Sequence, residues 1–301
     1  MKERKRLVLP SKQERHRLFG SITPGPKTKP TEKKDMPDLQ NAKKDFIFEI
    51  DAVGISNVKH PVTVNSNLAP FEQTTVANFT FTSKVPSNQK GTNMSRFTEQ
   101  LQQYYSKGFS VSITELYDFA RELATRLEQD NAVLEMTFPW FYERKGPASG
   151  ISGLNHAEAY IKVEFDVNNG YSSEVGLTCA VTTLCPCSKE ISEYSAHNQR
   201  GYIKMTTEVD EDLLGDVDWK EALLHAAESN ASAMIHPVLK RPDEKMVTET
   251  AYENPRFVED MVRLVAADLY ELQFVTAFTV ECRNEESIHL HDAIASLSFR
   301  K

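Results

Sequence analysis

Hydrophobic and polar positions in the first half of the chain follow two different periods. A period of two residues, as at Phe46, Phe48 and Ile50, predicts β-strands, and it recurs in four stretches: 45–55, 74–84, 132–142 and 158–167. Residues 95–106 and 112–129 have helical spacing instead, and Ser112 is a suitable N-cap for the second helix. This half is therefore predicted to run strand, strand, helix, helix, strand, strand.

The second half repeats this order of elements, although its sequence identity to the first half is negligible. Its predicted strands cover 171–184, 201–209, 274–283 and 288–299, and its predicted helices cover 219–231 and 256–272. Strands that follow each other in pairs with short links favour antiparallel hairpins with helices on one face, which is an α+β fold. The turn signal Asn168-Asn169-Gly170 divides the chain into an N-terminal module, 45–169, and a C-terminal module, 170–301.

Residues 1–44 differ from the rest in charge and composition. Residues 1–45 contain 13 Lys and Arg against six Asp and Glu, whereas the remainder contains 22 against 37, and the whole chain has a net charge of −8. Five prolines and few large apolar residues predict a disordered or loosely docked tail. Its basic residues are not interleaved with aromatic ones, and the acidic body would repel phosphate backbones, so we expect no nucleic-acid partner.

The sequence indicates neither a membrane protein nor a disulfide-rich one. No apolar run approaches 18 residues, and no apolar segment follows the basic N-terminus as in a secretory signal. Four cysteines are too few for a disulfide framework, and Cys185 and Cys187 are too close to bridge without strain. We expect a cytoplasmic protein, in which Cys and His favour metal binding or catalysis.

The segment 184–201 contains the densest set of chemically active groups. It has two thiols, Cys185 and Cys187, and one imidazole, His197. Thiolate, imidazole and carboxylate are ligands that Zn²⁺, Fe²⁺ or Mn²⁺ accept. No second Cys pair exists, which excludes a four-thiolate structural site, and a mixed site would leave a position open for catalysis. The alternative is that the thiols are inert and His197 is an ordinary surface or core residue.

Further candidate groups lie elsewhere in the chain. His289 and His291 are two residues apart in a predicted strand and hence on one face, although such a pair can equally be a hydrogen-bonding surface. Glu244 lies in a segment that its prolines mark as a loop, where a lone glutamate is normally only solvated. Core packing is predicted for Cys179, Cys282, Trp140 and Trp219.

Five cations flank predicted loops or helix starts. Arginine binds phosphate through two hydrogen bonds and lysine as a point charge, so a cluster of them would suit a polyphosphate. Each one alone is more typical of a solvated surface. The five are Arg96, Lys189, Arg200, Lys240 and Arg241.

Four segments occur in a recognisable order: Asn93–Phe97, Leu184–Gly201, His236–Asp260 and Glu286–Asp292. Together they resemble GTP cyclohydrolase type IB, the alternative GTP cyclohydrolase I of many bacteria, from about residue 45 to the C-terminus. The resemblance implies the tunnelling fold, with two modules of four antiparallel strands and two helices, and a homotetramer with sites between subunits. It also implies conversion of GTP and water to 7,8-dihydroneopterin triphosphate and formate, the first step of tetrahydrofolate biosynthesis.

The same resemblance implies a centre for a divalent metal, with Zn, Mn or Fe as candidates. Cys185 matches its essential thiol, and His197 and Glu244 match further residues of that centre. His289 is assigned as the remaining histidine, with His291 as the competing assignment. Cys187 is expected to lie behind the ligands or to act as an alternative thiol.

The resemblance also implies how the substrate is held. Glu259 matches the glutamate that anchors the purine, because a carboxylate can accept hydrogen bonds from guanine N1–H and the 2-amino group. The five cations are candidates for the triphosphate. Metal-bound water with a pKa near ~7 would attack guanine C8, and an imidazole would protonate N7.

Two other functions compete with this interpretation. One is a tunnelling-fold nitrile reductase of queuosine synthesis, which uses a thiol nucleophile and NADPH and needs no metal. The other is a non-catalytic module that binds metal or nucleic acid through the basic tail.

Overall fold

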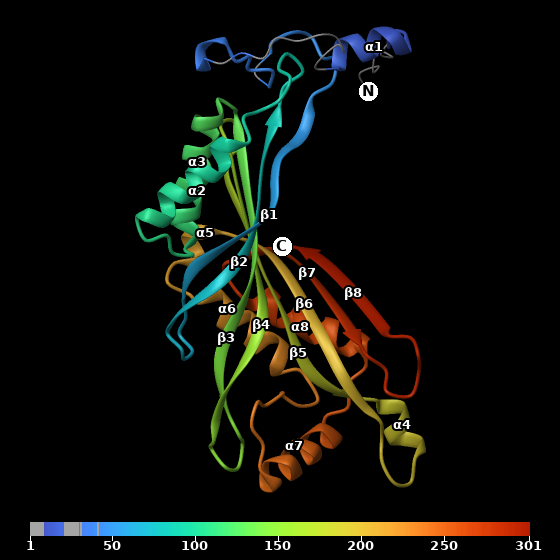
Figure 1. Cartoon of the computed structure of the whole chain (residues 1–301). Coiled ribbons are helices and arrows are strands. Elements are labelled where there is room, and N and C mark those ends of the chain that lie inside the picture. The colour runs from blue at the N-terminus through green and yellow to red at the C-terminus, as the bar shows by residue number, and fades with distance from the viewer. Residues whose placement is uncertain (1–8, 21–29, 31, 41) are drawn as a thin grey trace.

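Eight antiparallel strands form one continuous sheet in the order β1 to β8 (Figure 1). The computed structural model describes the chain except for residues 1–8, 21–29, 31 and 41. The strands are β1 (Ile50–Asn65), β2 (Glu72–Val85), β3 (Asn131–Lys145), β4 (Ser152–Asp166), β5 (Gly170–Leu184), β6 (Asn198–Val209), β7 (Val275–Asn284) and β8 (Ala293–Arg300). Every neighbour in the sheet is therefore also a neighbour in the order of strands along the chain, and the connections β2–β3 and β6–β7 contain most of the helices.

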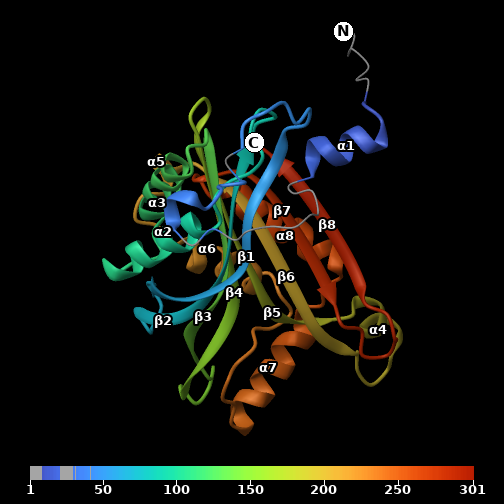
Figure 2. The ribbon, with the colours of Figure 1, turned by 45° about the horizontal axis from the view of Figure 1, so that its top comes forward.

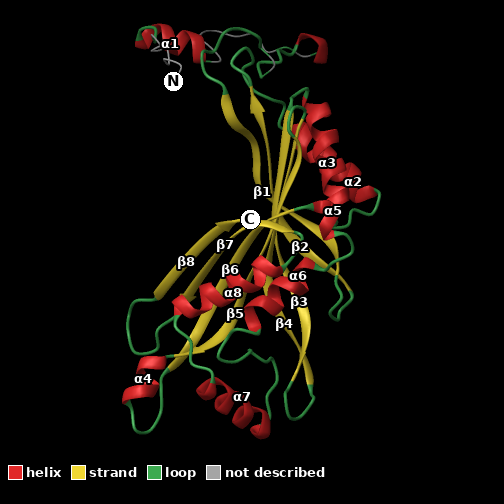
Figure 3. Ribbon diagram, turned by 180° about the vertical axis from the view of Figure 1, so that it is seen from behind, coloured by secondary structure: helices red, strands yellow, loops and turns green. Residues whose placement is uncertain are grey.

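The two helices that the periodicity predicts for each half of the chain are present. They are α2 (Ser95–Ser106) and α3 (Ile113–Leu127) in the first half, and α6 (Trp219–Glu228) and α8 (Val258–Glu271) in the second. Seen from behind, α6 and α8 lie across the second half of the sheet, while α2 and α3 lie beside the first half (Figure 3). The predicted α+β architecture of antiparallel strands and helices is confirmed.

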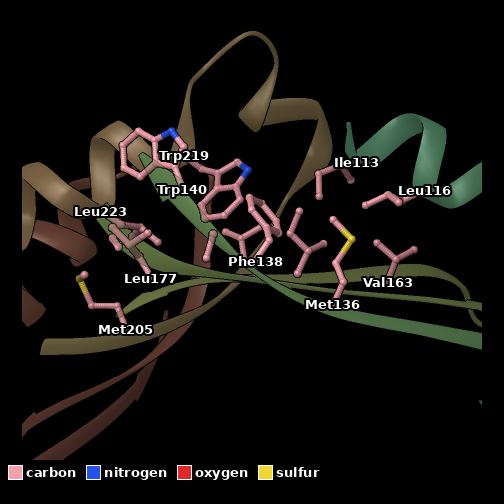
Figure 4. Packing of buried hydrophobic residues seen from close by; sticks show 14 of the residues in the cluster. Ile113, Leu116, Met136, Phe138, Trp140, Val163, Leu177, Met205, Trp219 and Leu223 are labelled. Atoms are coloured by element: carbon pink, nitrogen blue, oxygen red, sulfur yellow. The ribbon is translucent and has the colours of Figure 1, made fainter. Parts of the chain in front are cut away.

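One hydrophobic core runs through both modules. Ile113 and Leu116 of α3 lie near Met136 and Val163 in the same buried cluster that contains Trp219 and Leu223 of α6 with Leu177 and Met205 (Figure 4). Trp140, which is completely buried, lies between the two groups. Core roles for Trp140, Trp219, Cys179 and Cys282 are confirmed, since all four are buried.

The local signals explain where several elements begin and end. Ser112 caps α3 by accepting a hydrogen bond from the Glu115 N–H at 3.2 Å, as its position predicts. The turn between β4 and β5 places Gly170 at φ +79°, a region that favours glycine. Asp166 Oδ1 accepts hydrogen bonds from the N–H groups of Asn168 and Asn169. The predicted module boundary therefore falls at a tight turn inside one sheet.

Four helices were not predicted, and two predicted strands begin too early. The strand predicted over 45–55 begins only at Ile50 and continues to Asn65, so Phe46 and Phe48 lie outside it. The additional helices are α1 (Lys12–Phe19), α4 (Pro186–Ile191), α5 (Glu211–Leu214) and α7 (Arg241–Glu253), together with a 3₁₀ turn, Lys33–Asp35. Residues 12–19 of the predicted disordered tail form α1 because Ser11 and Glu14 make a capping box. The strand predicted over 288–299 begins only at Ala293, because Ala293 pairs with Asn284 at the end of β7.

Candidate active site

Cys185 and His197 are neighbours at the loop end of the β5–β6 hairpin, where the connection between the two strands begins and ends. Leu184 pairs with Asn198 at the last rung of the hairpin, and the Cys185 N–H then donates to the His197 carbonyl at 3.0 Å. Ser188 forms hydrogen bonds with both residues: its hydroxyl donates to the Cys185 carbonyl at 3.1 Å and accepts from the His197 N–H at 3.2 Å. The backbone thus places next to each other the two residues, Cys185 and His197, that the sequence singled out.

The Cys185 side chain also begins a helix. Cys185 is the N-cap of α4, and its Sγ lies 3.5 Å from the Ser188 N–H, which donates to it. Pro186 follows in the first turn, where a missing N–H costs nothing. The short helix therefore fixes the direction of the thiol, and Cys187 lies exposed in its first turn.

Hydrogen bonds define the orientation of the His197 ring. Nδ1–H donates to Gln199 Oε1 at 3.0 Å, and the Gln199 amide in turn donates to Thr183 at 3.1 Å. Glu286 Oε2 lies 3.8 Å from the same nitrogen, and both side chains are largely buried. A proton on Nδ1 leaves the lone pair on Nε2, which is the form that binds a metal. Glu286 is a functional candidate that sequence reasoning did not assign, because no spacing connects it to His197.

Glu244 lies in a helix and not in the predicted loop. Pro242 is in the first turn of α7, so the prolines that indicated a loop instead mark a helix start. Glu244 shares one face of α7 with Val247 and Ala251, since they are three and seven residues apart. Val247 and Ala251 pack against Leu184, the last residue of β5. The exposed Glu244 carboxylate therefore extends the helix face that is turned toward the end of β5.

Four of the five predicted cations lie on elements around this end of the sheet. The Lys189 ammonium donates to the Tyr252 carbonyl and lies 4.4 Å from the centre of the Tyr252 ring, which joins α4 to α7. Lys240 and Arg241 are exposed at the start of α7. Arg200 is an exposed residue of β6 that lines a cavity of about 310 Å³.

Arg96 is elsewhere in the chain. It lies in α2, where it donates to the Arg126 carbonyl at 2.6 Å and pairs with Glu128 at 3.3 Å. Figure 1 shows α2 at the other end of the molecule from α4 and α7. The chain therefore does not bring Arg96 to the Cys185 side of the sheet.

His236 also lines the cavity beside Arg200, together with Thr182, Gln199 and Val247. Its Nδ1–H donates to the Lys145 carbonyl at 3.0 Å. Burial lowers the pKa of His236 below its ordinary value, and the bond to Lys145 only partly offsets this. The sequence analysis did not assign His236 a role. The only feature that could have indicated one was its position in a Pro-rich segment.

The paired histidines occupy a loop and not the face of a strand. His289 and His291 lie in the exposed β7–β8 connection, with their rings stacked at a centroid distance of 4.8 Å. The prediction that both project from one face of a strand is therefore wrong. Their exposure leaves both imidazoles accessible to a ligand or a second subunit.

Glu259 lies in the first turn of α8 and is exposed. An acidic side chain there is favourable beside the free N–H groups of the helix start. Burial, with a smaller contribution from Glu259, raises the pKa of the Cys282 thiol to about 12. Cys282 is therefore a neutral core thiol, in contrast to the partly exposed Cys185.

In the part of the chain that the structure describes, no three His, Cys, Asp or Glu side chains form a ready metal cage. The predicted donors Cys185 and His197 are brought together, with Glu286 beside the imidazole. Glu244 lies on α7, and His289 and His291 lie in the β7–β8 connection. The metal roles of these residues stay predictions.

The fold places the chain in a known structural class. Its architecture is similar to the crystal structure of uricase from Arthrobacter globiformis, with a TM-score of 0.54, 8% sequence identity, and coverage of 83% of this chain and 93% of that one. The likeness shows the fold alone, and the protein is a tunnelling-fold protein, as predicted.

Sequence comparisons identify the family within this class. The family described as type I GTP cyclohydrolase folE2 matches residues 36–295. GTP cyclohydrolase FolE2 of Oceanobacillus iheyensis is 63% identical over 294 residues, covering 97% of both chains, and that of Bacillus subtilis is 56% identical, covering 98% of this chain and 97% of its own. The chain belongs to the type I GTP cyclohydrolase FolE2 family, which confirms the resemblance. Among the described residues, no helix is long and apolar enough to cross a membrane.

Proposed function

We propose that this protein is a metal-dependent GTP cyclohydrolase I of the cytoplasm, which converts GTP and water to 7,8-dihydroneopterin triphosphate and formate for tetrahydrofolate biosynthesis. Membership of the family supports the reaction. The observation that carries the assignment of the site is the 3.0 Å hydrogen bond that makes Cys185 and His197 neighbours.

The donor chemistry fits a borderline divalent cation such as Zn²⁺, Mn²⁺ or Fe²⁺. Cys185, His197 and Glu244 would hold it, with His289 as the remaining ligand and His291 as the alternative. A bound cation supplies a Lewis acid that makes hydroxide available at neutral pH. Hydrogen bonds to Gln199 and Ser188 keep the His197 ring and the Cys185 loop in place for this role.

The chain's own residues bind and orient the purine. Glu259 accepts hydrogen bonds from guanine N1–H and the 2-amino group, which distinguishes guanine from adenine. The histidine of the β7–β8 loop that is not a ligand protonates N7 as C8 is attacked, and a second hydrolysis releases C8 as formate. Rearrangement of the ribose carbons then closes the pterin ring.

The triphosphate needs cations from more than one place. Lys189, Lys240, Arg241 and Arg200 are the candidates at the Cys185 end of the sheet, and Arg96 would have to act from another subunit. A homotetramer allows this arrangement. The homotetramer is supported by the open sheet, since among the described residues the outer strands β1 and β8 each pair with one other strand of the sheet.

The direct test is incubation of the purified protein with GTP and Mn²⁺, followed by oxidation and measurement of pterin fluorescence. We expect a fluorescent pterin and one formate per GTP, and loss of both after treatment with a chelator. Turnover that resists chelation would exclude the metal mechanism. Absence of pterin with every metal tried would exclude the reaction.

A further inference from the structure

The end of the β3–β4 hairpin, residues 144–150 (here the hairpin tip), contacts the second module at three successive residues. Arg144 forms an ion pair with Glu228 of α6, a carboxylate that also accepts from the Tyr142 hydroxyl at 3.4 Å. The Lys145 carbonyl accepts from His236, and Gly146 lies against Asp243 of α7. Three separate segments of the second module thus meet one tip of the first. Figure 2 shows this hairpin end beside α7.

Asp243 is completely buried, and its carboxylate joins the two modules. Oδ1 accepts from the N–H groups of Ala148 and Ser149 in the hairpin tip, both at 2.8 Å. Oδ2 accepts from the Lys240 N–H at 2.8 Å, which caps the start of α7. A buried carboxylate needs such donors, and hydrogen bonds to an ionised acceptor are stronger than neutral ones. One side chain therefore fixes the first turn of α7 to the other module.

Close packing at two glycines leaves little freedom for this junction to shift. A Cβ on Gly146 would lie 2.9 Å from Asp243 Oδ1, and a Cβ on Gly153 would lie 2.8 Å from Pro237 Cγ. Separations below about 3 Å are steric clashes for carbon atoms, so only glycine permits the approach. Asn155 adds a hydrogen bond to the Ile235 carbonyl at 2.7 Å. Residues 235–237, which precede α7, therefore rest on the β3–β4 hairpin.

We propose that Asp243 is a positioning residue, through which the hairpin tip of the first module sets the place of Glu244, Lys240 and Arg241 at the active site. The Glu244 N–H donates to the Lys240 carbonyl at 2.9 Å, so the Glu244 backbone belongs to the same turn that Asp243 fixes. Neighbouring helix residues project about 100° apart. Asp243 therefore faces the hairpin tip while Glu244 remains free to reach a ligand. This inference rests on the proposed function for the role of Glu244, but the mechanical link to the hairpin tip does not.

The test compares Asp243→Ala, Gly146→Ala and a matched control, Asp166→Ala. Asp166 likewise accepts from two successive backbone N–H groups of a hairpin turn, Asn168 and Asn169, but it does so at the β4–β5 turn, away from α7. The measurements are the Mn²⁺ dissociation constant by electron paramagnetic resonance, kcat and KM for GTP, and hydrogen exchange of α7. Gly146→Ala disturbs the same contact from the hairpin-tip side. It therefore tests the link between the hairpin tip and α7 even if Asp243→Ala does not fold.

We expect both junction variants to raise the Mn²⁺ dissociation constant about 10- to 100-fold, the range typical of residues that orient metal ligands, and to speed exchange of the α7 amides. Asp166→Ala should leave both unchanged. Unchanged exchange of α7 in the junction variants, or an equal effect of Asp166→Ala, would overturn the proposal. If the unmodified protein neither binds Mn²⁺ nor converts GTP, the proposed function fails, whereas the exchange measurement still decides whether the hairpin tip positions α7.

Discussion

A small hydrophobic cluster, here the α7 seat, attaches α7 to the end of β5 and can be tested by Leu184→Ala. The α7 seat consists of Leu184, Ala196, Ala233, Val247 and Ala251, with Leu184 only 3% exposed. Removing three buried carbons at about 0.8 kcal/mol each gives roughly 2.4 kcal/mol, and buried Leu→Ala changes cost about 2–5 kcal/mol. Because the cluster is small and lies at an edge, its neighbours can relax, and we expect the lower end, about 2.5 kcal/mol.

The assay is hydrogen exchange of the α7 amides, combined with urea unfolding. If α7 opens locally, a loss of about 2.5 kcal/mol speeds its exchange about 60-fold, since 1.4 kcal/mol is a factor of ten. Leu127→Ala is the matched control, because Leu127 is 1% exposed but lies at the end of α3 in the main core. It should lower the free energy of global unfolding without changing local exchange of α7. Exchange of α7 within threefold of the unmodified rate in Leu184→Ala would refute the reasoning.

Three further predictions concern the site and the junction between modules. Cys185→Ala and Glu244→Ala should each abolish formate release with an unchanged circular dichroism spectrum, and near-normal turnover would remove that residue from the mechanism. Glu259→Gln should weaken GTP binding about tenfold or more, because one acceptor becomes a donor; equal affinity in a titration would exclude the anchoring role. Burial raises the pKa of Asp218, but Lys220 and hydrogen bonds from the β1–β2 loop hold it below its usual range. The stabilisation is present above about pH 4 and lost as the pH falls, so Asp218→Asn should flatten the acid side of the stability–pH curve, and equal acid slopes in urea unfolding would contradict this.

The regular part of the fold could be predicted because burial imposes a period on the sequence. The helix predicted over 112–129 is observed at Ile113–Leu127, with eight buried residues on one stripe and a Ser112 cap. Helix α2, predicted over 95–106, is observed with the same bounds, Ser95–Ser106. Where a helix covers a sheet, its apolar stripe is set by the core, so pattern and structure coincide.

The helices that were missed lack such a stripe. Only Asp243 and Ala251 are buried in α7, and none of the residues of α4 are. Helix caps and polar contacts with remote segments hold α4 and α7, and α7 has in addition only the small α7 seat, so neither helix leaves a clear hydrophobic period in the sequence. The β7–β8 loop shows the opposite error, because Ile288 and Leu290 alternate like a strand but are exposed and lie outside the paired rungs of β8.

The site also contains residues that the sequence could predict and residues that it could not. Cys185 and His197 could be predicted as partners because they flank one hairpin and lie close in sequence. Glu286 lies beside His197 from the β7–β8 connection, far along the chain, and Asp243 contacts Ala148 across 95 residues. Single-sequence patterns do not encode contacts at that separation, so the supporting residues emerged only from the fold.

Because α7 is attached at both ends, it can hold its site residues in fixed positions although few of its side chains are buried. A 13-residue helix is about 20 Å long, and α7 is held at its start by Asp243 and near its end by Ala251 and by the contact of Lys189 with Tyr252. A helix fixed at one end could pivot and move its first turn by several ångströms. With the second attachment, Glu244 cannot leave the β5 side unless the hairpin-tip bonds break. Loss of Asp243 should therefore disturb Glu244 more than loss of Lys189, which holds the distant end, and metal affinity in Asp243→Ala and Lys189→Met measures that difference directly.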